Sequence, residues 1–483
     1  MTVDQLLDER DATGVAEAIA AGEVSTREVA ECALARLHER NPAVNAVIAN
    51  RAEAALADID RGLPVGRLTG VPFVVKDLGV TVAGLPATNG SRLCAGVVAD
   101  RDSEIVRRYR DAGLVVLGMT NSPEYGRNAS TEPLLHGPTR NPRRLTHSAG
   151  GSSGGTAAAV AAGIVPAGHG NDGGGSIRIP ASACGLVGLK PTRGRTPAAP
   201  RRTAMSYPLG VNHALTRSVR DTAVLLDVAA GPTPGDPYVI PPPTRPYVDE
   251  VGADPGRRRI AFSLGTPAGD AVHPECASAV ERVAALLAGL GHDVEMEAPP
   301  YPTDALDTAM RVFFSVPLAV DVDARLAALG RGLQDDDLEP LTQLLYDSAK
   351  ALSATDVVIA HQELERASQA VGGFFAEHDL LLTATMARPV PPLGLLDTTD
   401  INAMVANAGV FAALTSPCNV TGQPAISLPL GHDSTGLPIG VQLVAAFGRE
   451  DLLLRVASQL EAAAPWDTRP VWPAVTGQPV NGQ

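Results

Sequence analysis

Two short segments rich in glycine and serine are the parts of the sequence that could do chemistry. Residues 150–155 read Gly-Gly-Ser-Ser-Gly-Gly, and residues 170–180 contain three consecutive glycines that lead directly into Ser176. Successive backbone N–H groups in such a run can point into one concavity and bind an anion. Acyl transfer needs donors of this kind where the tetrahedral oxygen develops charge, and a serine beside them is a candidate nucleophile. The two segments therefore predict a serine acyl-transfer site, although a single glycine-rich loop is more often a structural turn.

A serine nucleophile needs a base, and Lys76 is the candidate with the clearest position. It directly follows the continuously apolar run of residues 71–75, which is typical of a strand buried on both faces. In open α/β sheets, ligands bind at the carboxyl ends of such strands. Burial disfavours the charged form of an amine, so a lysine in this position could accept a proton. The structural alternative is a lysine that emerges from a strand to pair with Asp77 or with solvent.

A second pattern points to histidine-based chemistry instead. Residues 151–155 also fit G-x-S-x-G with Ser153 at the centre, which is typical of the nucleophile elbow of α/β-hydrolases. This interpretation makes the protein a Ser–His esterase that uses Ser153 and a late histidine such as His432. The elbow requires a strand directly before it, whereas residues 141–148 are polar and loop-like. The sequence contains no Walker A motif, dinucleotide fingerprint or HExxH, so we expect neither a cofactor nor a metal.

Composition and charge exclude several classes of protein. A hydrophobic fraction of 45% and a charged fraction of 19% are typical of a globular chain. The net charge of −14 argues against a nucleic-acid partner, which would need a basic face. The five cysteines include no CxxC pair, so neither a zinc knuckle nor a disulfide framework is predicted. The chain begins without the pattern of a secretory signal, and its longest apolar run is too short for a bilayer. We therefore expect a cytoplasmic protein with no membrane partner.

Helices and strands alternate along the chain in the rhythm of a mostly parallel sheet. A helix predicted near residues 102–111 ends at Gly113 and is followed by a buried strand at residues 114–117. A helix of small residues is predicted at residues 156–162, with a strand near residues 164–168. Further apolar runs predict strands at residues 260–264, 380–382, 425–430 and 439–444. The pattern favours an α/β fold.

One domain over residues 1–465 is expected, although the rule of roughly 150 residues per domain would allow three. The proline-rich residues 231–257 are interpreted as a surface connector. Residues 300–375 are predicted to be mainly helical and to form an excursion from the sheet that lines a substrate pocket. Residues 376–465 return to the sheet, and the tail at residues 466–483 is predicted to be loose.

Three of these pieces together resemble the amidase signature family. They are Lys76 within Gly-Val-Pro-Phe-Val-Val-Lys-Asp, the Gly-Gly-Ser-Ser-Gly-Gly run, and the Gly-Gly-Ser-Ile-Arg around Ser176. Further similar stretches occur at residues 118–124, 137–142, 184–192 and 419–425. The resemblance extends over roughly residues 10–465, with a signature core at residues 65–220. It implies a mixed, twisted sheet of about eleven strands, covered by helices on both faces.

The resemblance also implies a Ser–cis-Ser–Lys triad that hydrolyses an amide bond through an acyl-enzyme. Ser176 would be the nucleophile and Lys76 the ultimate base. Ser152 would relay the proton between them, held by a non-proline cis peptide to Ser153. Within the family, residues 169–172 and 419–466 look most similar to cyclic-amide hydrolases of nylon oligomers (6-aminohexanoate cyclic dimer).

The oxyanion hole and its support follow from the same resemblance. Its donors would be the backbone N–H groups of Gly173, Gly174, Gly175 and Ser176. Asp172 and Arg178 would pair beneath the loop and fix it. Two positions depart from the family pattern, because Asn171 replaces the usual Ser or Thr and Gly173 the usual Thr or Ile. Gly173 is expected to widen one wall of the hole and to make the loop more flexible.

The acyl pocket is expected to be lined by residues 124–132 and 310–318. The first segment contains Arg127, where the nylon-oligomer relatives have Asn, and the second is apolar and contains Phe314. An apolar pocket with one cation favours a hydrophobic or aryl acyl group. Cyclic or oligomeric amides are included among the candidate substrates. Acyl-transfer chemistry suits amides, esters and carbamates alike, so esterase and urethanase side activities belong to the hypothesis.

Two hypotheses that involve a partner protein stay open beside the amidase. The first is an amidotransferase-type subunit, but that subunit usually has Gln after Ser-Ile-Arg, where this chain has Ile179. The second is a non-catalytic subunit, against which the presence of Lys76, Ser152 and Ser176 argues. We therefore expect an amide hydrolase of a small-molecule substrate, with a homodimer as one assembly to test.

Overall fold

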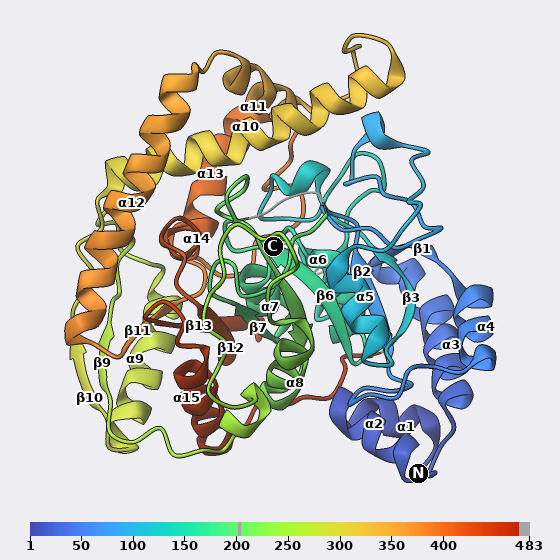
Figure 1. The fold of residues 1–483 in the computed structure, drawn as a ribbon. Coiled ribbons are helices and arrows are strands. Elements are labelled where there is room, and N and C mark those ends of the chain that lie inside the picture. The colour runs from blue at the N-terminus through green and yellow to red at the C-terminus, as the bar shows by residue number, and fades with distance from the viewer. Residues whose placement is uncertain (201–203, 473–483) are drawn as a thin grey trace, which may run out of the picture.

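The computed structural model describes residues 1–200 and 204–472. In these residues, eleven strands form one sheet in the order β1-β3-β2-β6-β8-β7-β12-β13-β11-β9-β10, with helices around it (Figure 1). The strands are β1 (Val47–Asn50), β2 (Pro72–Lys76), β3 (Val115–Thr120), β6 (Ala167–Asp172), β7 (Val187–Lys190), β8 (Val211–Thr216), β9 (Arg259–Phe262), β10 (Asp293–Met296), β11 (Leu380–Ala384), β12 (Ala425–His432) and β13 (Pro438–Ala445). The predicted α/β fold with a mixed sheet is confirmed.

Helices account for most of the remaining regular structure. They are α1 (Val3–Glu9), α2 (Ala12–Ala20), α3 (Thr26–Val44), α4 (Ala52–Arg61), α5 (Glu104–Asp111), α6 (Gly154–Ala161), α7 (Arg178–Cys184), α8 (Val219–Ala229), α9 (Pro274–Gly289), α10 (Thr303–Leu329), α11 (Pro340–Lys350), α12 (Ala354–Glu377), α13 (Ile401–Ala412), α14 (Ser416–Thr421) and α15 (Glu450–Ala463). Short 3-10 helices are η1 (Arg92–Cys94), η2 (Glu124–Gly126) and η3 (Tyr247–Glu250). Within the described residues, none of the helices is both long and apolar enough to cross a bilayer.

Strand β11 shows how one sheet is buried on both faces. Leu380 and Leu382 pack in a core cluster with residues of α9 and α15, whereas Leu381 packs against Phe374 of α12. Successive side chains of a strand point to opposite faces, so each face needs its own cover of helices. This two-sided burial explains why the sequence of the strand is a continuous apolar run rather than an alternating one.

The register of the sheet brings the ends of two strands together. Strand β2 pairs in parallel with β6, with Val74 opposite Gly168, and in parallel with β3. Because the carboxyl ends of parallel neighbours meet at the same edge, Lys76 at the end of β2 lies beside Asn171 and Asp172 at the end of β6. The sheet thus positions the candidate base next to the second glycine-rich loop.

Helix α6 follows the first glycine-serine run and consists of buried small residues. A Cβ atom at Gly155 would lie 2.4 Å from the backbone nitrogen of Asn121, so only glycine fits there. The close approach of backbone to backbone holds the start of α6 against the loop after β3.

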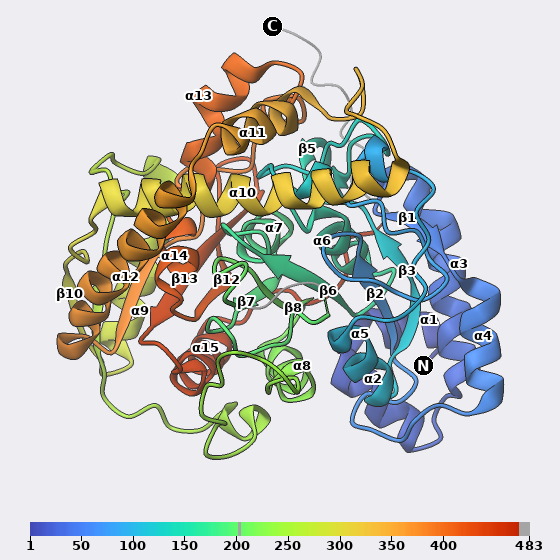
Figure 2. The ribbon, with the colours of Figure 1, turned by 45° about the horizontal axis from the view of Figure 1, so that its top comes forward.

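The segment predicted to be helical contains α10, α11 and α12. Figure 2 shows α10 crossing above the central strands, with α11 and α13 gathered on the same side. Phe313 of α10 packs on His361 of α12, with ring centroids 4.6 Å apart. Phe314 of α10 lines the same cavity as Asn171 at the end of β6, so α10 lies over the edge of the sheet where Lys76 lies.

Three local predictions differ from the structure. The strand predicted near residues 164–168 is β6, which begins later, at Ala167. Residues 231–257 are not merely a surface connector, because Tyr247 of η3 is 1% exposed and belongs to the core. The tail is not loose over residues 466–472, since the indole N–H of Trp466 donates to the Arg217 carbonyl at 3.0 Å. The rest of the predicted tail, residues 473–483, lies outside the described residues.

Candidate active site

The side chain of Lys76 is fully buried at the carboxyl end of β2. Its Nζ lies 2.7 Å from Ser152 Oγ and 2.6 Å from Asn171 Oδ1. Burial holds the pKa of Lys76 well below the usual range for a lysine, although the negative charge of Asp172 opposes this shift. A lysine with a lowered pKa is neutral at a lower pH and can then accept a proton.

The amide of Asn171 is oriented by a second hydrogen bond. Its Nδ2 donates to the carbonyl oxygen of Leu78 at 2.6 Å, and this oxygen can only accept. The Oδ1 atom of Asn171 must therefore face Lys76 and accept a hydrogen from Nζ. One hydrogen of a neutral amine is used in this way, which favours a lone pair directed at Ser152. The sequence marked Asn171 only as a departure from a family pattern, because the role depends on a contact with Leu78.

The cis peptide bond of this region lies between Gly151 and Ser152. The cis bond expected from the family resemblance, one residue later between Ser152 and Ser153, is wrong. Ser153 already belongs to the start of α6, where its carbonyl accepts from the N–H of Ala157. The backbone N–H of Ser153 donates to the carbonyl of Ser176 at 3.2 Å, so the two glycine-rich segments are joined directly.

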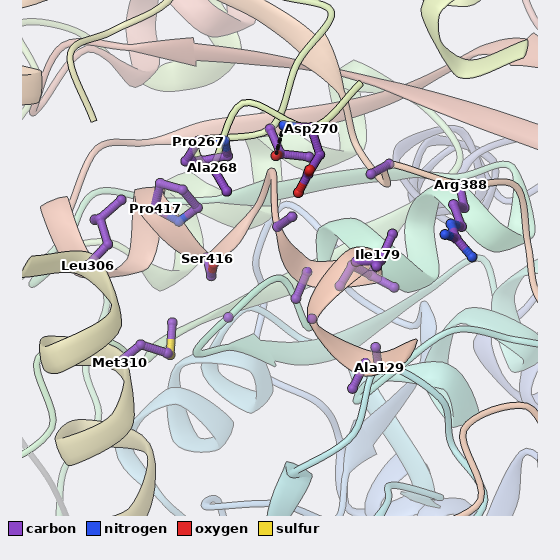
Figure 3. Close-up of a pocket in the computed structure, with 18 of the residues that line it drawn as sticks. Ala129, Ile179, Pro267, Ala268, Asp270, Leu306, Met310, Arg388, Ser416 and Pro417 are labelled. Atoms are coloured by element: carbon purple, nitrogen blue, oxygen red, sulfur yellow. Dashed lines mark hydrogen bonds between the residues drawn. The ribbon is translucent and has the colours of Figure 1, made fainter. Parts of the chain in front are cut away.

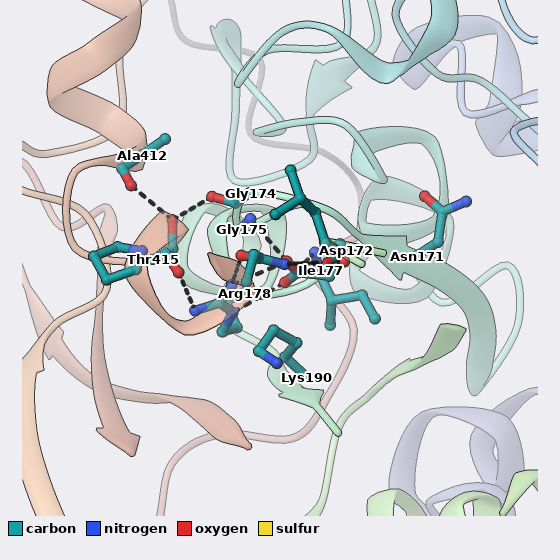
Figure 4. A network of polar contacts seen from close by, with 12 residues as sticks. Asn171, Asp172, Gly174, Gly175, Ile177, Arg178, Lys190, Ala412 and Thr415 are labelled. Carbon is teal, nitrogen blue, oxygen red and sulfur yellow. Dashed lines mark hydrogen bonds and ion pairs between the residues drawn. The ribbon is translucent and has the colours of Figure 1, made fainter. Parts of the chain in front are cut away.

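Asp172 and Arg178 form an ion pair beneath the second loop, and both side chains are 0% exposed (Figure 4). The guanidinium donates from Nε to Oδ2 and from Nη2 to Oδ1, each at 2.9 Å. The same carboxylate accepts from the backbone N–H groups of Gly175 and Ile177. Burial raises the pKa of Asp172, but the charge and hydrogen bonds of Arg178 outweigh it and hold this pKa below its usual range.

The remaining donors of Arg178 bind the C-terminal third of the chain. They donate to the Thr415 carbonyl at 2.9 Å, to Gln442 Oε1 at 2.8 Å and to Asn419 Oδ1 at 2.7 Å. All five N–H groups of the guanidinium thus have acceptors. Asn419 lay within a stretch that resembles the family, whereas nothing in the sequence marked Thr415 or Gln442.

The backbone amides of the loop are not equivalent as oxyanion donors. The N–H of Gly175 donates to Asp172 Oδ1 at 2.8 Å, so its predicted place in the hole is taken by the carboxylate. Within the described part of the chain, the N–H groups of Gly173, Gly174 and Ser176 have no acceptor. Ser176 itself is half-buried and lies on the walls of two cavities.

Gly173 was expected to widen one wall of the oxyanion hole, but the side chain of Tyr207 fills the space beside it. A Cβ atom at this position would lie 2.5 Å from the hydroxyl oxygen of Tyr207, so the tyrosine already occupies that space. Arg127 Nη1 donates to the same hydroxyl at 3.5 Å. The usual Thr or Ile is therefore replaced by a pair, Gly173 and Tyr207, whose relation no local sequence pattern reveals.

Arg127 and Phe314, both expected from the sequence to line the acyl pocket, contact each other and line both cavities. The guanidinium carbon of Arg127, which follows η2, lies 4.2 Å from the ring centroid of Phe314 on α10. Arg127 is only 6% exposed, so the stack is largely screened from water. Figure 3 shows the larger of the two cavities beside it, with Met310 of α10, Ile179 of α7 and Pro417 of α14 directed toward one space.

Comparison with known proteins assigns the family. The amidase family model matches residues 28–454, most of the chain. The chain belongs to the amidase signature family. Its relatives include a 6-aminohexanoate-cyclic-dimer hydrolase of Paenarthrobacter ureafaciens, 42% identical over 95% of this chain and 96% of the relative. A putative amidase AmiC of Mycobacterium leprae is 38% identical over 96% of this chain and 97% of the relative. The protein is therefore an amide hydrolase of this family.

Solved structures agree with this assignment. The structure of 6-aminohexanoate cyclic dimer hydrolase complexed with substrate superposes with a TM-score of 0.91 at 41% identity, over 96% of this chain and 98% of that chain. A bacterial aryl acylamidase of the amidase signature family superposes with a TM-score of 0.87 at 28% identity, over 98% of this chain and 100% of that chain. The fold and the family are thus shown by sequence and by structure.

The alternative Ser–His site receives no support from the amidase fold. The hydroxyl of Ser153 is buried and donates to the Asn171 carbonyl at 3.2 Å. His432 is exposed at the end of β12, and neither residue lines either cavity. Residues 141–148 are not a plain loop, since β4 (Arg140–Asn141) and β5 (Arg144–Ser148) pair as a small hairpin, but this hairpin is separate from the large sheet.

Proposed function

We propose that the protein hydrolyses a carboxylic amide of a small molecule through an acyl-enzyme on Ser176. The observation that carries this proposal is the 2.7 Å contact between Nζ of the buried Lys76 and Ser152 Oγ. A buried amine of lowered pKa in hydrogen-bond contact with a hydroxyl is suited to remove a proton without histidine. The cavity wall that contains Ser152 also contains Ser176, which supports a relay from one serine to the other.

In the first half of the reaction, neutral Lys76 takes the proton of Ser152 while Ser152 takes the proton of Ser176. The freed oxygen of Ser176 attacks the amide carbon, and the C=O bond becomes a tetrahedral C–O⁻. The backbone N–H groups of Gly173 and Gly174 are the donors available to this oxygen. Ser152 then gives a proton to the amide nitrogen and recovers one from the Lys76 ammonium, which becomes neutral again. The tetrahedral C–O⁻ returns to C=O as the C–N bond breaks, and the amine departs.

The second half regenerates the enzyme. A water molecule gives its proton to Ser152, which passes one to Lys76, and the hydroxide attacks the ester carbon of the acyl-enzyme. The C–O bond to Ser176 breaks, the acid is released, and Ser176 recovers its proton through the same relay. No histidine and no metal is needed in this scheme.

The substrate is proposed from the cavity and from the relatives. A cavity of about 1090 Å³ next to Ser176 is larger than a short acyl group requires. Two similar proteins are named for the hydrolysis of 6-aminohexanoate cyclic dimer. Cyclic or oligomeric amides are therefore the first class to test, with esters and carbamates as side activities of the same acyl transfer.

The test uses purified wild type, Ser176→Ala and Ser153→Ala with matched amide, ester and carbamate substrates. We expect Ser176→Ala to lose amide turnover by about 10³-fold or more and to lose labelling by fluorophosphonates. Ser153→Ala is the matched control and should keep both. Loss of labelling in Ser153→Ala alone would favour the elbow hypothesis. Turnover by the isolated chain would also exclude a need for a partner subunit.

A further inference from the structure

Two cavities of very different size meet at Ser176. The larger has a volume of about 1090 Å³ and the smaller about 70 Å³. Ser176 lies on the wall of both, together with Gly126, Arg127 and Phe314. An amide bound at Ser176 would therefore have one cavity available to each side of its C–N bond. The acyl group would occupy one cavity and the amine the other.

The groups beside Ser176 indicate which cavity the amide nitrogen faces. Ser152 and Asn171 line the smaller cavity and not the larger one. In the proposed mechanism, Ser152 returns the proton to the leaving nitrogen and must lie within hydrogen-bond reach of it. The nitrogen consequently faces the smaller cavity. The acyl carbon carries its substituent on the opposite side, toward the larger cavity.

The linings of the cavities match this division. The larger cavity has an apolar wall that includes Ile179, Leu306 and Met310. Asp270 and Arg388 of its lining are exposed at its rim (Figure 3), whereas the buried charge of Arg127 is stacked on Phe314. A long or bulky apolar acyl group can be buried against the apolar wall while the charges of Asp270 and Arg388 stay in water.

Side chains close in on the smaller cavity and limit its volume. Tyr207, Leu78 and Asn212 contribute to its described lining. Its volume is enough for a few water molecules or a small amine, and far below that of a site for a drug-sized group. An extended substituent on the amide nitrogen would collide with this wall.

We propose that the smaller cavity is the site of the leaving amine, and that it restricts open-chain substrates to primary and N-methyl amides of large apolar acids. This inference rests on the proposed function and adds a substrate class to it. A cyclic amide is compatible with it, because the ring ties the amine substituent back toward the larger cavity. Open-chain secondary amides with long amine substituents are disfavoured. Linear oligomeric amides belong to this group, so the inference narrows the cyclic or oligomeric amides of the proposed function to the cyclic ones.

The experiment measures kcat/KM of the full-length enzyme for octanamide, N-methyloctanamide and N-hexyloctanamide. The last two have the same intrinsic reactivity, so their ratio reports space on the amine side. We expect N-hexyloctanamide to be poorer than N-methyloctanamide by about 100-fold or more, a range that pocket shape can supply. In contrast, lengthening the acyl group from acetamide to octanamide should raise kcat/KM several-fold for each few methylenes.

Two variants test whether the wall of the smaller cavity limits the size of the amine substituent. Tyr207→Ala enlarges only the smaller cavity and should raise the N-hexyl to N-methyl ratio at least tenfold. Met310→Ala enlarges only the larger cavity and should leave this ratio unchanged while it alters the preference for acyl length. Leu78→Ala repeats the first test on a different element if Tyr207→Ala does not fold.

The outcomes separate this inference from the proposed function. Equal rates for the N-methyl and N-hexyl amides, abolished by Ser176→Ala, would overturn the inference and support the proposed function. A ratio that responds to Met310→Ala and not to Tyr207→Ala or Leu78→Ala would also overturn it. If no amide is hydrolysed, or if Ser176→Ala retains turnover, the proposed function fails and the inference fails with it.

Discussion

The loop beneath the site and the wall above it are held in different ways. Residues 172–178 are fixed by directional bonds, since Asp172 accepts from two backbone amides and every N–H of Arg178 has an acceptor. Helix α10 is held by apolar packing, and Met310 on its cavity side is half-buried. Directional bonds to buried charges tolerate little change, whereas apolar packing tolerates substitution of similar volume. The difference suggests that the chemistry of this amidase is fixed and its substrate range adjustable.

Loss of the base Lys76 should have the largest effect on activity. Lys76→Ala removes the group that accepts the proton from Ser152, and we expect amide turnover to fall by about 10³-fold or more. A matched ester should lose less, because an alkoxide can depart without the proton that an amine requires. The measurement is kcat for an amide and an ester of the same acid. An equal loss on both substrates would argue that Lys76 does not serve the leaving group.

A change in the buried ion pair should act on stability. Arg178→Lys cannot reproduce five donors in a fork, so it leaves part of Asp172 and its other acceptors without partners. We expect the free energy of unfolding to fall by about 3–5 kcal/mol. Urea denaturation measures it, and the exposed pair of Arg366 and Asp304 provides the control. Arg366→Lys should change the free energy of unfolding by less than about 1 kcal/mol. Similar losses in the free energy of unfolding in both variants would mean that the buried pair is no more sensitive to substitution than the exposed one.

The pH dependence of activity should follow the ionisation of Lys76. Its lowered pKa means that activity rises with pH as Lys76 loses its proton and then persists into the alkaline range. Asn171→Asp places a negative charge on the atom that accepts from Nζ, which favours the ammonium form. The ascending limb of the kcat profile should therefore move upward by about 1–3 pH units.

A second buried lysine provides a sharp control for this profile. Burial, together with the charge of Arg178, lowers the pKa of Lys190 to about 7. Lys190 lines neither cavity, and its Nζ donates to the Pro191 carbonyl at 3.0 Å. Lys190→Met should keep the ascending limb where it is in the wild type. A limb that disappears in Lys190→Met and is unmoved in Asn171→Asp would assign the ionisation to Lys190.

The smallest effect is expected from the adjustable wall. Met310→Leu nearly conserves volume, so the free energy of unfolding should change by less than about 1.5 kcal/mol. The preference among acyl chains of different length should change a few-fold, since Met310 lines the larger cavity. Thermal unfolding and kcat/KM across a series of primary amides measure the two quantities. A loss of stability as large as that of Arg178→Lys would contradict the comparison.

The strands that could be predicted from the sequence are those whose apolar runs are long. Residues 71–75 and 439–444 predicted β2 (Pro72–Lys76) and β13 (Pro438–Ala445) closely. Strand β6 was displaced in the prediction because its residues, Ala-Gly-His-Gly-Asn-Asp, have no strand propensity of their own. Pairing with β2 and β8 imposes the extended conformation there.

In the active site too, the residues of contiguous motifs could be predicted from the sequence, whereas contacts between distant segments could not. The glycine-serine runs and Lys76 could be recognised because they are contiguous motifs. Asn171 could not be assigned a partner, because its orientation depends on the Leu78 carbonyl. The relation of Gly173 to Tyr207 and that of Arg178 to Gln442 arise only when distant segments pack together. Contacts of this kind have no signature in a single sequence.

The hydrogen bonds of Arg178 also have a consequence for synthesis of the chain, because some of its acceptors are translated long after it. Gln442 is 264 residues beyond Arg178. At about 5–20 residues per second, translation needs roughly 10–50 s to cover that stretch. Throughout this interval the nascent chain already contains Lys76, Ser152 and Ser176, but the guanidinium must bind water in place of Gln442. A ribosome-bound chain that stops before residue 415 therefore contains every group of the proposed triad but lacks three of the acceptors of Arg178, namely Thr415, Asn419 and Gln442.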